Sequence, residues 1–313
     1  MNKKLHILEA GLMAVLLAMG SGCTEDASPV NESENSDQMT FNILHPRQAA
    51  TGTKVTSTAF ESGDQVGLFI TRQDAPLEVS GNYVNNAALT FDGSQWTTKK
   101  PVYWDGGTYN IYAYYPQASP VASVDDMPFR VSTDQNAAGG YENSDFLWAT
   151  QMNASASNTP VNLQFAHRMS RMLIRLVKGE DYEGELPTDA EVYIHNTVPE
   201  ATIDLSVGIV TRNDYGTRQS IRAQSLGNHT YAAIIVPQRL DNRQPLVEVI
   251  MKGVSYLYES KFVFKPGIQH SVQLVISKNP EQIKIEIGGE LEDWDEWWKC
   301  PTKTNKCLTN ELN

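Results

Sequence analysis

Cysteine and basic residues are both scarce in this sequence of 313 residues, which holds three cysteines and 25 lysines plus arginines against 37 aspartates plus glutamates. The formal net charge of −12 repels phosphate backbones, so we predict no nucleic-acid partner. Apolar runs long enough to cross a bilayer as a helix are missing, and so are long amphipathic helical patterns. These absences leave a globular composition that favours strands over helices.

Sequence motifs of catalysis are missing as well, since there is no glycine-rich phosphate loop, no GxSxG elbow and no HExxH helix. Five histidines follow the first segment without the spacing of metal ligands: His45, His167, His195, His229 and His270. His167, beside an arginine at a strand start, is interpreted as a hydrogen-bonded structural residue. The acidic residues at 290–296 lack the glycine and spacing of a calcium loop and are interpreted as a solvated face. We therefore predict no enzyme activity, no cofactor and no metal site.

The first 22 residues have the features of a secretory signal peptide. Lys3 and Lys4 precede an apolar stretch over 12–19 and the small residues 20–22, and that stretch is too short to span a bilayer. Because Cys23 follows at once, the segment resembles a lipoprotein signal, and we predict acylation of Cys23 as a membrane anchor. The alternative is a secreted chain whose Cys23 is lost or free. Residues 23–38, acidic and nearly devoid of apolar side chains, are predicted to form a solvated tether.

Strand patterns fill most of the remaining chain, which contains 13 tyrosines, nine phenylalanines and six tryptophans. Met39, Phe41 and Ile43 alternate with polar residues, a pattern that predicts a half-buried strand. Further apolar runs are separated by breaks that contain glycine or proline. They predict strands at 65–70, 109–116, 161–165, 172–176, 191–195, 221–224, 231–237, 246–251, 255–264, 271–277 and 283–287. We therefore predict an all-β protein.

A small, polar segment at 153–160 is the best internal linker. It divides the strands into two antiparallel sandwiches, predicted over 39–158 and 159–296. The remaining tail, 297–313, contains Cys300 and Cys307, and export to an oxidising compartment predicts a disulfide between them.

An aromatic cluster lies between residues 103 and 115, and two interpretations of it are open. It comprises Tyr103, Trp104, Tyr109, Tyr112, Tyr114 and Tyr115. These rings could stack on sugars, but Tyr112 and Tyr114 share one strand face, where packing against a second sheet is the ordinary explanation.

Five short motifs follow one another along the chain, and each occurs once. They are FESGDQVGLF at 60–69, PVYW at 101–104 with AYYP at 113–116, FAHRMSR at 165–171, VPQ at 236–238, and FKPG at 264–267 with His270. Together they resemble the Bacteroidales fimbrillin-like family, the type V pilins, over about residues 51–295. The acidic residues after Cys23 are similar to the tract that directs lipoproteins of these bacteria to the outer surface.

The resemblance implies two tandem transthyretin-like, Greek-key β-sandwiches and a surface-exposed place on the outer membrane, within a fimbrium. It implies a structural and adhesive subunit that is cut in its first strand by an Arg-specific protease, for which Arg47 is the candidate site. A donor strand from another copy or from a minor subunit then fills the vacated groove. The partners expected are therefore other fimbrial subunits, the membrane through the lipid anchor, and a host or bacterial surface receptor.

Two segments have the periodicity of an exchanged strand: Met39, Phe41 and Ile43 near the start, and Ile283, Ile285 and Ile287 near the end. We hypothesise that both fill one groove, whereas the simpler alternative makes 283–287 the last strand of the second domain. A Cys-containing tail would thread poorly into a narrow groove, so stalk, tip and anchor positions all stay open. A monomeric surface lipoprotein that binds glycans is the alternative function.

Overall fold

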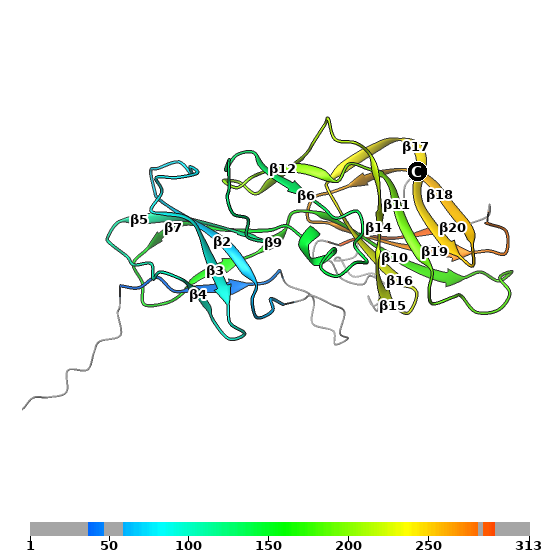
Figure 1. The fold of residues 1–313 in the computed structure, drawn as a ribbon, viewed down its shortest axis with the longest axis horizontal. Helices are drawn as coiled ribbons and strands as arrows, with labels where there is room; N and C mark the ends of the chain where they lie inside the picture. The colour runs from blue at the N-terminus through cyan, green and yellow to red at the C-terminus, as the bar shows by residue number, and fades with distance from the viewer. Residues whose placement is uncertain (1–36, 47–58, 281–283, 292–313) are drawn as a thin grey trace, which may run out of the picture. The chain divides into compact units, whose positions relative to one another are not determined.

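The computed structural model describes residues 37–46, 59–280 and 284–291 (Figure 1). Over these residues the chain is all-β, as predicted, and its one helical segment is the single 3₁₀ turn η1 (Glu142–Ser144). No helix in the described ranges is long and apolar enough to cross a bilayer. Cys23, Arg47, Ile283, Cys300 and Cys307 lie outside the described residues.

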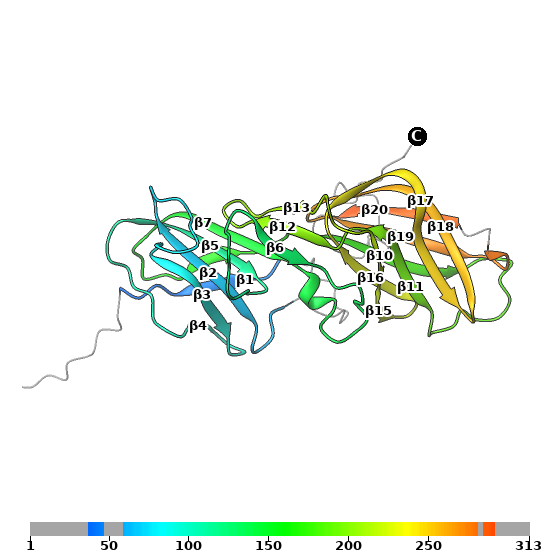
Figure 2. The same ribbon diagram turned by 45° about the horizontal axis from the view of Figure 1, so that its top comes forward.

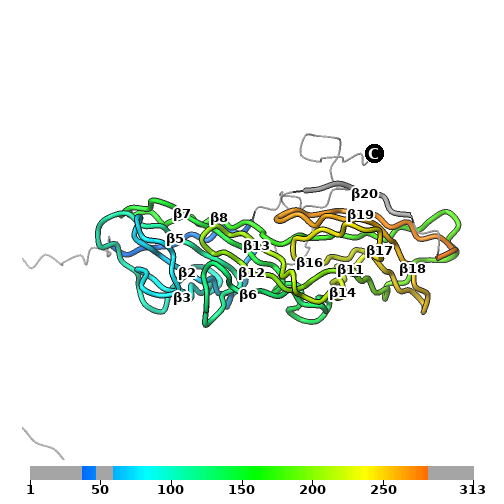
Figure 3. Tube along the Cα trace, turned by 90° about the horizontal axis from the view of Figure 1, so that it is seen from above, coloured from blue at the N-terminus to red at the C-terminus, as the bar shows by residue number. Residues whose placement is uncertain are grey.

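The first half of the described chain forms a six-stranded sheet and a separate two-stranded pair. The large sheet has the order β4 (Trp96–Thr98), β3 (Val84–Phe91), β2 (Gln65–Arg72), β5 (Thr108–Tyr115), β7 (Leu147–Ser155) and β9 (Ala166–His167). The pair joins β1 (Phe41–Leu44) to β8 (Val161–Gln164) in parallel, side by side in Figure 3.

The second half contains three further sheets (Figure 2). One has the order β15 (Gln224–Gly227), β16 (Thr230–Ile235), β10 (Ser170–Lys178), β19 (Gln269–Ile276) and β20 (Lys284–Leu291). Another has the order β14 (Gln219–Arg222), β11 (Glu191–Thr197), β17 (Gln238–Met251) and β18 (Val254–Phe264). The third has the order β13 (Ile209–Arg212), β12 (Glu200–Asp204) and β6 (Met127–Arg130).

Two hydrophobic clusters hold these sheets together, and β2 contributes to both. Leu68 and Ile70 belong to the first cluster, which also contains Met39 and Ile43. Phe69, which points to the opposite face, belongs to the second and larger cluster, which includes residues of both halves. Because both faces of β2 are covered, its interior reads as a continuous apolar run instead of an alternating one.

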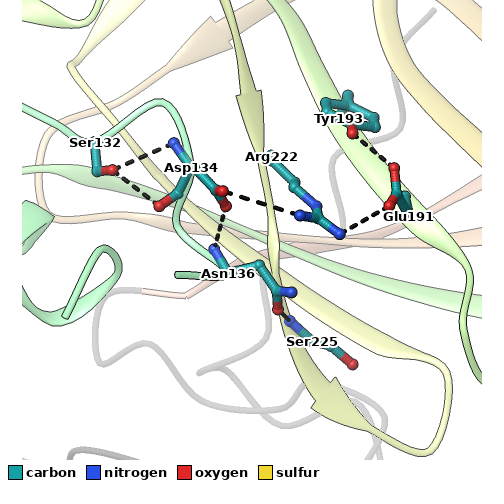
Figure 4. Close-up of polar contacts among 7 residues, drawn as sticks. All are labelled: Ser132, Asp134, Asn136, Glu191, Tyr193, Arg222 and Ser225. Carbon is teal, nitrogen blue, oxygen red and sulfur yellow. Dashed lines mark hydrogen bonds and ion pairs between the residues drawn. The ribbon is translucent and has the colours of Figure 1, made fainter. Parts of the chain in front are cut away.

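The segment before η1 is tied to strands of the second half. Asp134 and Glu191 both pair with the Arg222 guanidinium, at 3.9 and 2.8 Å, and the hydroxyl of Tyr193 donates to Glu191 (Figure 4). Beside this network, the fully buried Gln135 side chain donates to the carbonyl of Ile234 and accepts from its N–H, each at 2.7 Å. The pairing of β15 with β16 ends before Ile234. The side-chain amide of Gln135 therefore makes the two hydrogen bonds to Ile234 that the backbone of a neighbouring strand would otherwise make.

The predicted linker at 153–160 includes the end of β7, which reaches Ser155. After the loop, β8 pairs with β1 and β9 pairs with β7, so the chain enters the sheets of the second half only at β10. Conversely, β6 pairs with β12 although it precedes the predicted linker.

Candidate functional site: the N-terminal strand and its groove

The N-terminal strand is hydrogen-bonded along both of its edges. On one side the N–H of Val161 donates to the carbonyl of Thr40 at 2.8 Å, and the N–H of Phe165 donates to that of Leu44 at 2.9 Å. On the other side the N–H of Met39 donates to the carbonyl of Val102 at 2.8 Å. The N-terminal segment therefore fills a slot between β8 and the segment around residue 102.

Side chains of this segment alternate between the hydrophobic cluster and solvent, as the sequence predicts. Met39 and Ile43 are buried within the first hydrophobic cluster, and Phe41 packs against it half-buried. Thr40 and Asn42 point outward and are exposed. Because successive residues of a strand face opposite sides, this alternation fixes the register of the segment in its slot.

His45 follows the strand, and aromatic rings enclose it. Its ring lies edge-on to Phe60 at 5.0 Å and to His167 at 6.1 Å between centroids, and its Nδ1 is 3.2 Å from the carbonyl oxygen of Pro46. Burial lowers the pKa of His45 below its ordinary value of 6.5, and the nearby His167 ring adds to that effect. The chain then leaves the described region toward Arg47.

The family-type motifs supply the walls of this slot. Val102 and Trp104, from the PVYW motif, are buried in the same cluster, and the N–H of Trp104 donates to the carbonyl of Asp37. Phe60, from the first motif, packs edge-on against Trp96 and Tyr115. Three of the five motifs, at 60–69, 101–116 and 165–171, therefore contribute to the cluster that covers the strand, whereas Val236 of VPQ and Phe264 of FKPG belong to the other cluster.

The FAHRMSR motif, which spans 165–171, passes from one hydrophobic cluster to the other. Phe165 belongs to the first cluster and Met169 to the second. Between them, the buried His167 is hydrogen-bonded through Nδ1 to Asp145 at 3.0 Å, as its structural interpretation predicts. Arg171, also buried, donates to the side-chain oxygen of Gln269 at 2.9 Å.

The C-terminal candidate strand lies in another sheet. The β20 backbone pairs antiparallel with β19 and forms an edge of the five-stranded sheet, with Ile285 opposite Leu274 and Ile287 opposite Val272 (Figure 1). In this state of the protein the two candidate exchange segments therefore occupy different sheets and do not compete for one slot.

The aromatic cluster is largely inaccessible to a ligand. Trp104, Tyr109, Tyr112 and Tyr114 are buried, and Tyr115 is half-buried. Tyr103 alone among the six is exposed, at 40%. The packing interpretation of Tyr112 and Tyr114 is confirmed, since both belong to the second hydrophobic cluster.

The structure brings together a histidine, a serine and a glutamate whose proximity could not be predicted from the sequence. His195 on β11 lies with Nδ1 2.6 Å from the hydroxyl oxygen of Ser220 and Nε2 3.0 Å from a carboxylate oxygen of Glu248. The three residues come from β11, β14 and β17, which are neighbours in one sheet. No short-range spacing joins 195, 220 and 248, so only knowledge of the strand pairing could have found the set.

These observations define an all-β protein whose N-terminal strand is seated in a slot to which three of the five motifs contribute. The chain belongs to the Fimbrillin-like family, whose model matches residues 53–294. This confirms the resemblance carried by the five motifs. The family comprises structural proteins and not enzymes, so the His195 set is a structural hydrogen-bond chain across a sheet.

Individual relatives agree with this assignment. A protein of Bacteroides ovatus named "Putative fimbrium tip subunit Fim1C" is 27% identical over an alignment of 194 residues, and the alignment covers 56% of this chain and 35% of that protein. The chain thus spans about a third of the length of that curated relative.

Two solved structures share the fold. A "putative cell adhesion protein" of Bacteroides ovatus aligns with a TM-score of 0.65 at 17% identity, over 81% of this chain and 95% of that one. Another, from Bacteroides uniformis, aligns with a TM-score of 0.63 at 18% identity, over 80% and 96%. At these identities the likeness establishes the all-β fold alone.

Proposed function

We propose that this protein is a structural and adhesive subunit of a cell-surface fimbrium, assembled by exchange of its N-terminal strand. Membership of the Fimbrillin-like family supports a fimbrial role, and the name of the Bacteroides ovatus relative supports a place at or near the tip. The architecture that we propose is two tandem transthyretin-like sandwiches behind a lipid-anchored tether at Cys23.

The seating of β1 is the observation that carries the proposal. Withdrawing the segment would expose the apolar surface that now covers Met39 and Ile43. It would also leave the N–H groups of Val161 and Phe165 without their acceptors. An apolar trough bordered by unpaired backbone groups is a template for an incoming strand, because main-chain bonds supply affinity and alternate side chains supply register.

We propose a sequence of events that rests on the order of Cys23, β1 and Arg47 along the chain. Export as a lipoprotein keeps β1 in place during folding, and cleavage at Arg47 then separates β1 and its anchor from the remainder of the chain. The released slot accepts a strand of the same periodicity from another subunit. Ile283, Ile285 and Ile287 mark one such strand, and a strand of a minor subunit is another donor.

A protease experiment tests this proposal. The full-length chain carrying Cys23→Ser, exported without lipidation, is digested briefly with an Arg-specific protease and run unboiled on a denaturing gel. We expect SDS-resistant multimers only after a cut at Arg47. The matched control, Arg47→Gln, keeps the strand covalently attached and should stay monomeric on the gel.

If the cut protein forms no multimers, its binding of a peptide with the sequence of β1 shows whether the slot can accept a strand. Cut protein that forms no ladder but binds a synthetic peptide spanning residues 38–45 supports a subunit that takes its donor from a partner. Cut protein that neither multimerises nor binds the peptide contradicts the proposal. That result would favour the monomeric glycan-binding lipoprotein, for which the burial of Trp104 and Tyr109 gives no support.

A further inference from the structure

The long strand β18 (Val254–Phe264) forms an edge of the four-stranded sheet and pairs there with β17 alone. Figure 2 shows β18 in gold beside β17. At 11 residues it is about twice the usual strand length. Among the described residues, therefore, β18 presents an extended row of backbone groups at a sheet edge, which is a template for pairing with another chain.

The two faces of β18 differ in character. Tyr256 and Phe264 are buried on the inner face, where Tyr258 and Phe262 also pack against the core. The outer face carries five exposed residues in alternate positions: Ser255, Leu257, Glu259, Lys261 and Val263. Of these, Leu257 and Val263 are 41% and 42% exposed, so both aliphatic side chains are available to a second strand.

This outer face is complementary to itself. If two copies of β18 pair antiparallel around a two-fold axis through Ser260, Glu259 of one copy faces Lys261 of the other, and this happens twice. Leu257 then faces Val263, also twice. Opposite charges and apolar pairs directly across two strands are both stabilising. On the inner face, the aromatic residues continue from one copy to the next in the same register.

Neighbouring registers lack this match. An axis through Glu259 places the two Glu259 carboxylates opposite each other, and an axis through Lys261 does the same with two ammonium groups. Like charges directly opposite are destabilising. A lysine in an edge strand normally discourages pairing; here it discourages the register centred on Lys261 itself, whereas the register centred on Ser260 makes it half of an attractive pair.

We propose that β18 is a self-association surface, through which two copies of this chain pair edge to edge with Ser260 on the two-fold axis. The interface is isologous, since the same strand serves in both copies. It joins two four-stranded sheets into one continuous sheet and makes no use of β1 or its slot. The proposal therefore extends the fimbrial role to lateral pairing of subunits without depending on strand exchange.

One existing contact competes with the pairing. The Arg243 guanidinium lies 3.7 Å from Glu259 on the same molecule, with both side chains largely exposed. Exposed pairs of this kind contribute little, so Glu259 can turn to a second copy at small cost. Arg243→Ala should leave the dimer as strong or strengthen it.

Sedimentation equilibrium tests the proposal on the full-length exported chain carrying Cys23→Ser and Arg47→Gln, in which β1 cannot be released by the protease. We expect a monomer–dimer equilibrium. Lys261→Glu should raise the dissociation constant by roughly tenfold or more, because two attractive pairs become repulsive, and Glu259→Lys should do the same. An equal mixture of the two variants should recover the dimer, since each Glu-only edge then meets a Lys-only edge.

A covalent trap supplies a second measurement. With Cys300 and Cys307 replaced by serine, Ser260→Cys should form a dimer under mild oxidation, because residues on the axis face each other within disulfide range. The matched control Val263→Cys places the two thiols about six residues apart along the paired strands, roughly 20 Å, and should not form one. A chain that stays monomeric overturns the proposal, and so does a dimer that both charge reversals leave unchanged.

Discussion

The contact between Gly67 and Tyr114 explains two motif residues at once. They lie directly opposite each other on β2 and β5, and the Tyr114 ring covers Gly67 so closely that an added Cβ would lie 2.2 Å from Cε1. The ring is itself fixed, since it stacks on Phe69 and Phe146 and its hydroxyl donates to Asn86 at 2.8 Å. Burial raises the pKa of Tyr114 to about 12, so the phenol stays neutral at physiological pH.

This contact gives a prediction at the residue scale. Gly67→Ala should lower the free energy of unfolding by about 2–3 kcal/mol, because the fixed ring cannot move aside. In a Tyr114→Ala background the same substitution should be close to neutral, since the obstacle is gone and alanine suits a strand better than glycine. Urea denaturation of the four proteins in this double-mutant cycle measures the coupling. Equal effects of Gly67→Ala in both backgrounds would contradict the account.

Gln135 allows a second residue-scale prediction. Gln135→Met keeps the approximate volume of the side chain but leaves the buried N–H and C=O of Ile234 without partners. Losing both hydrogen bonds should cost about 2–4 kcal/mol in the free energy of unfolding. The control Gln73→Met, at an exposed position, should change it by less than about 0.5 kcal/mol. A similar loss for both variants would show that the peptide-like bonds of Gln135 are not the cause.

At the scale of elements, the proposed exchange requires that β1 can leave its slot. The lowered pKa of His45 predicts that the attachment of β1 depends on pH. The lowered pKa of seated His45 means that the released segment binds a proton more readily than the seated one. Seating is therefore strongest above the ordinary pKa of 6.5 and weakens as the pH falls below it. His167, Asp145 and Asp64 are the other titratable groups that act on His45.

Hydrogen exchange checks this prediction directly. After correction for intrinsic rates, protection of the Val161 and Phe165 amides should fall between about pH 7.5 and about pH 5.5, a range that spans the ordinary histidine pKa. The variant His45→Gln should show no such fall, and amides in β10 should be unaffected in both proteins. A fall of the same size in His45→Gln would assign the effect to another group.

The sequence predicts these elements to very different extents. Period-two alternation at 39–43 predicts both the strand and its buried face, and the motifs identify the family, because both signals are local. The pairing of β1 with β8 could not be predicted, since Phe41 and Val161 are joined only by the folded chain. The same holds for the pairing of β6 with β12 and for the meeting of His195 with Ser220 and Glu248.

For the whole molecule, we propose two routes of association through two different strands. In the proposed assembly the β1 slot links subunits through replacement of a strand that the chain itself supplies, whereas in the proposed pairing β18 offers an edge that needs no replacement. A net charge of −12 opposes both routes through mutual repulsion, which salt screens, but at the β18 edge salt also weakens the attraction between Glu259 and Lys261. The slot nevertheless carries the central claim, because three of the five motifs contribute to the hydrophobic cluster that covers β1.

An intermolecular disulfide tests that claim most directly. Asn162 lies beside Asn42 of β1, with a 2.8 Å hydrogen bond between their side chains, so a strand that replaces β1 must place an outward residue beside position 162. In protein lacking the three native cysteines, Asn162→Cys is combined with Lys284→Cys or, separately, with Glu286→Cys, and oxidised before and after the cut at Arg47. Our account predicts that one of the two pairs links different copies in the multimers that form after the cut and not in the uncut protein. Multimers without either linkage would contradict the claim that the 283–287 strand of one copy fills the slot of the next.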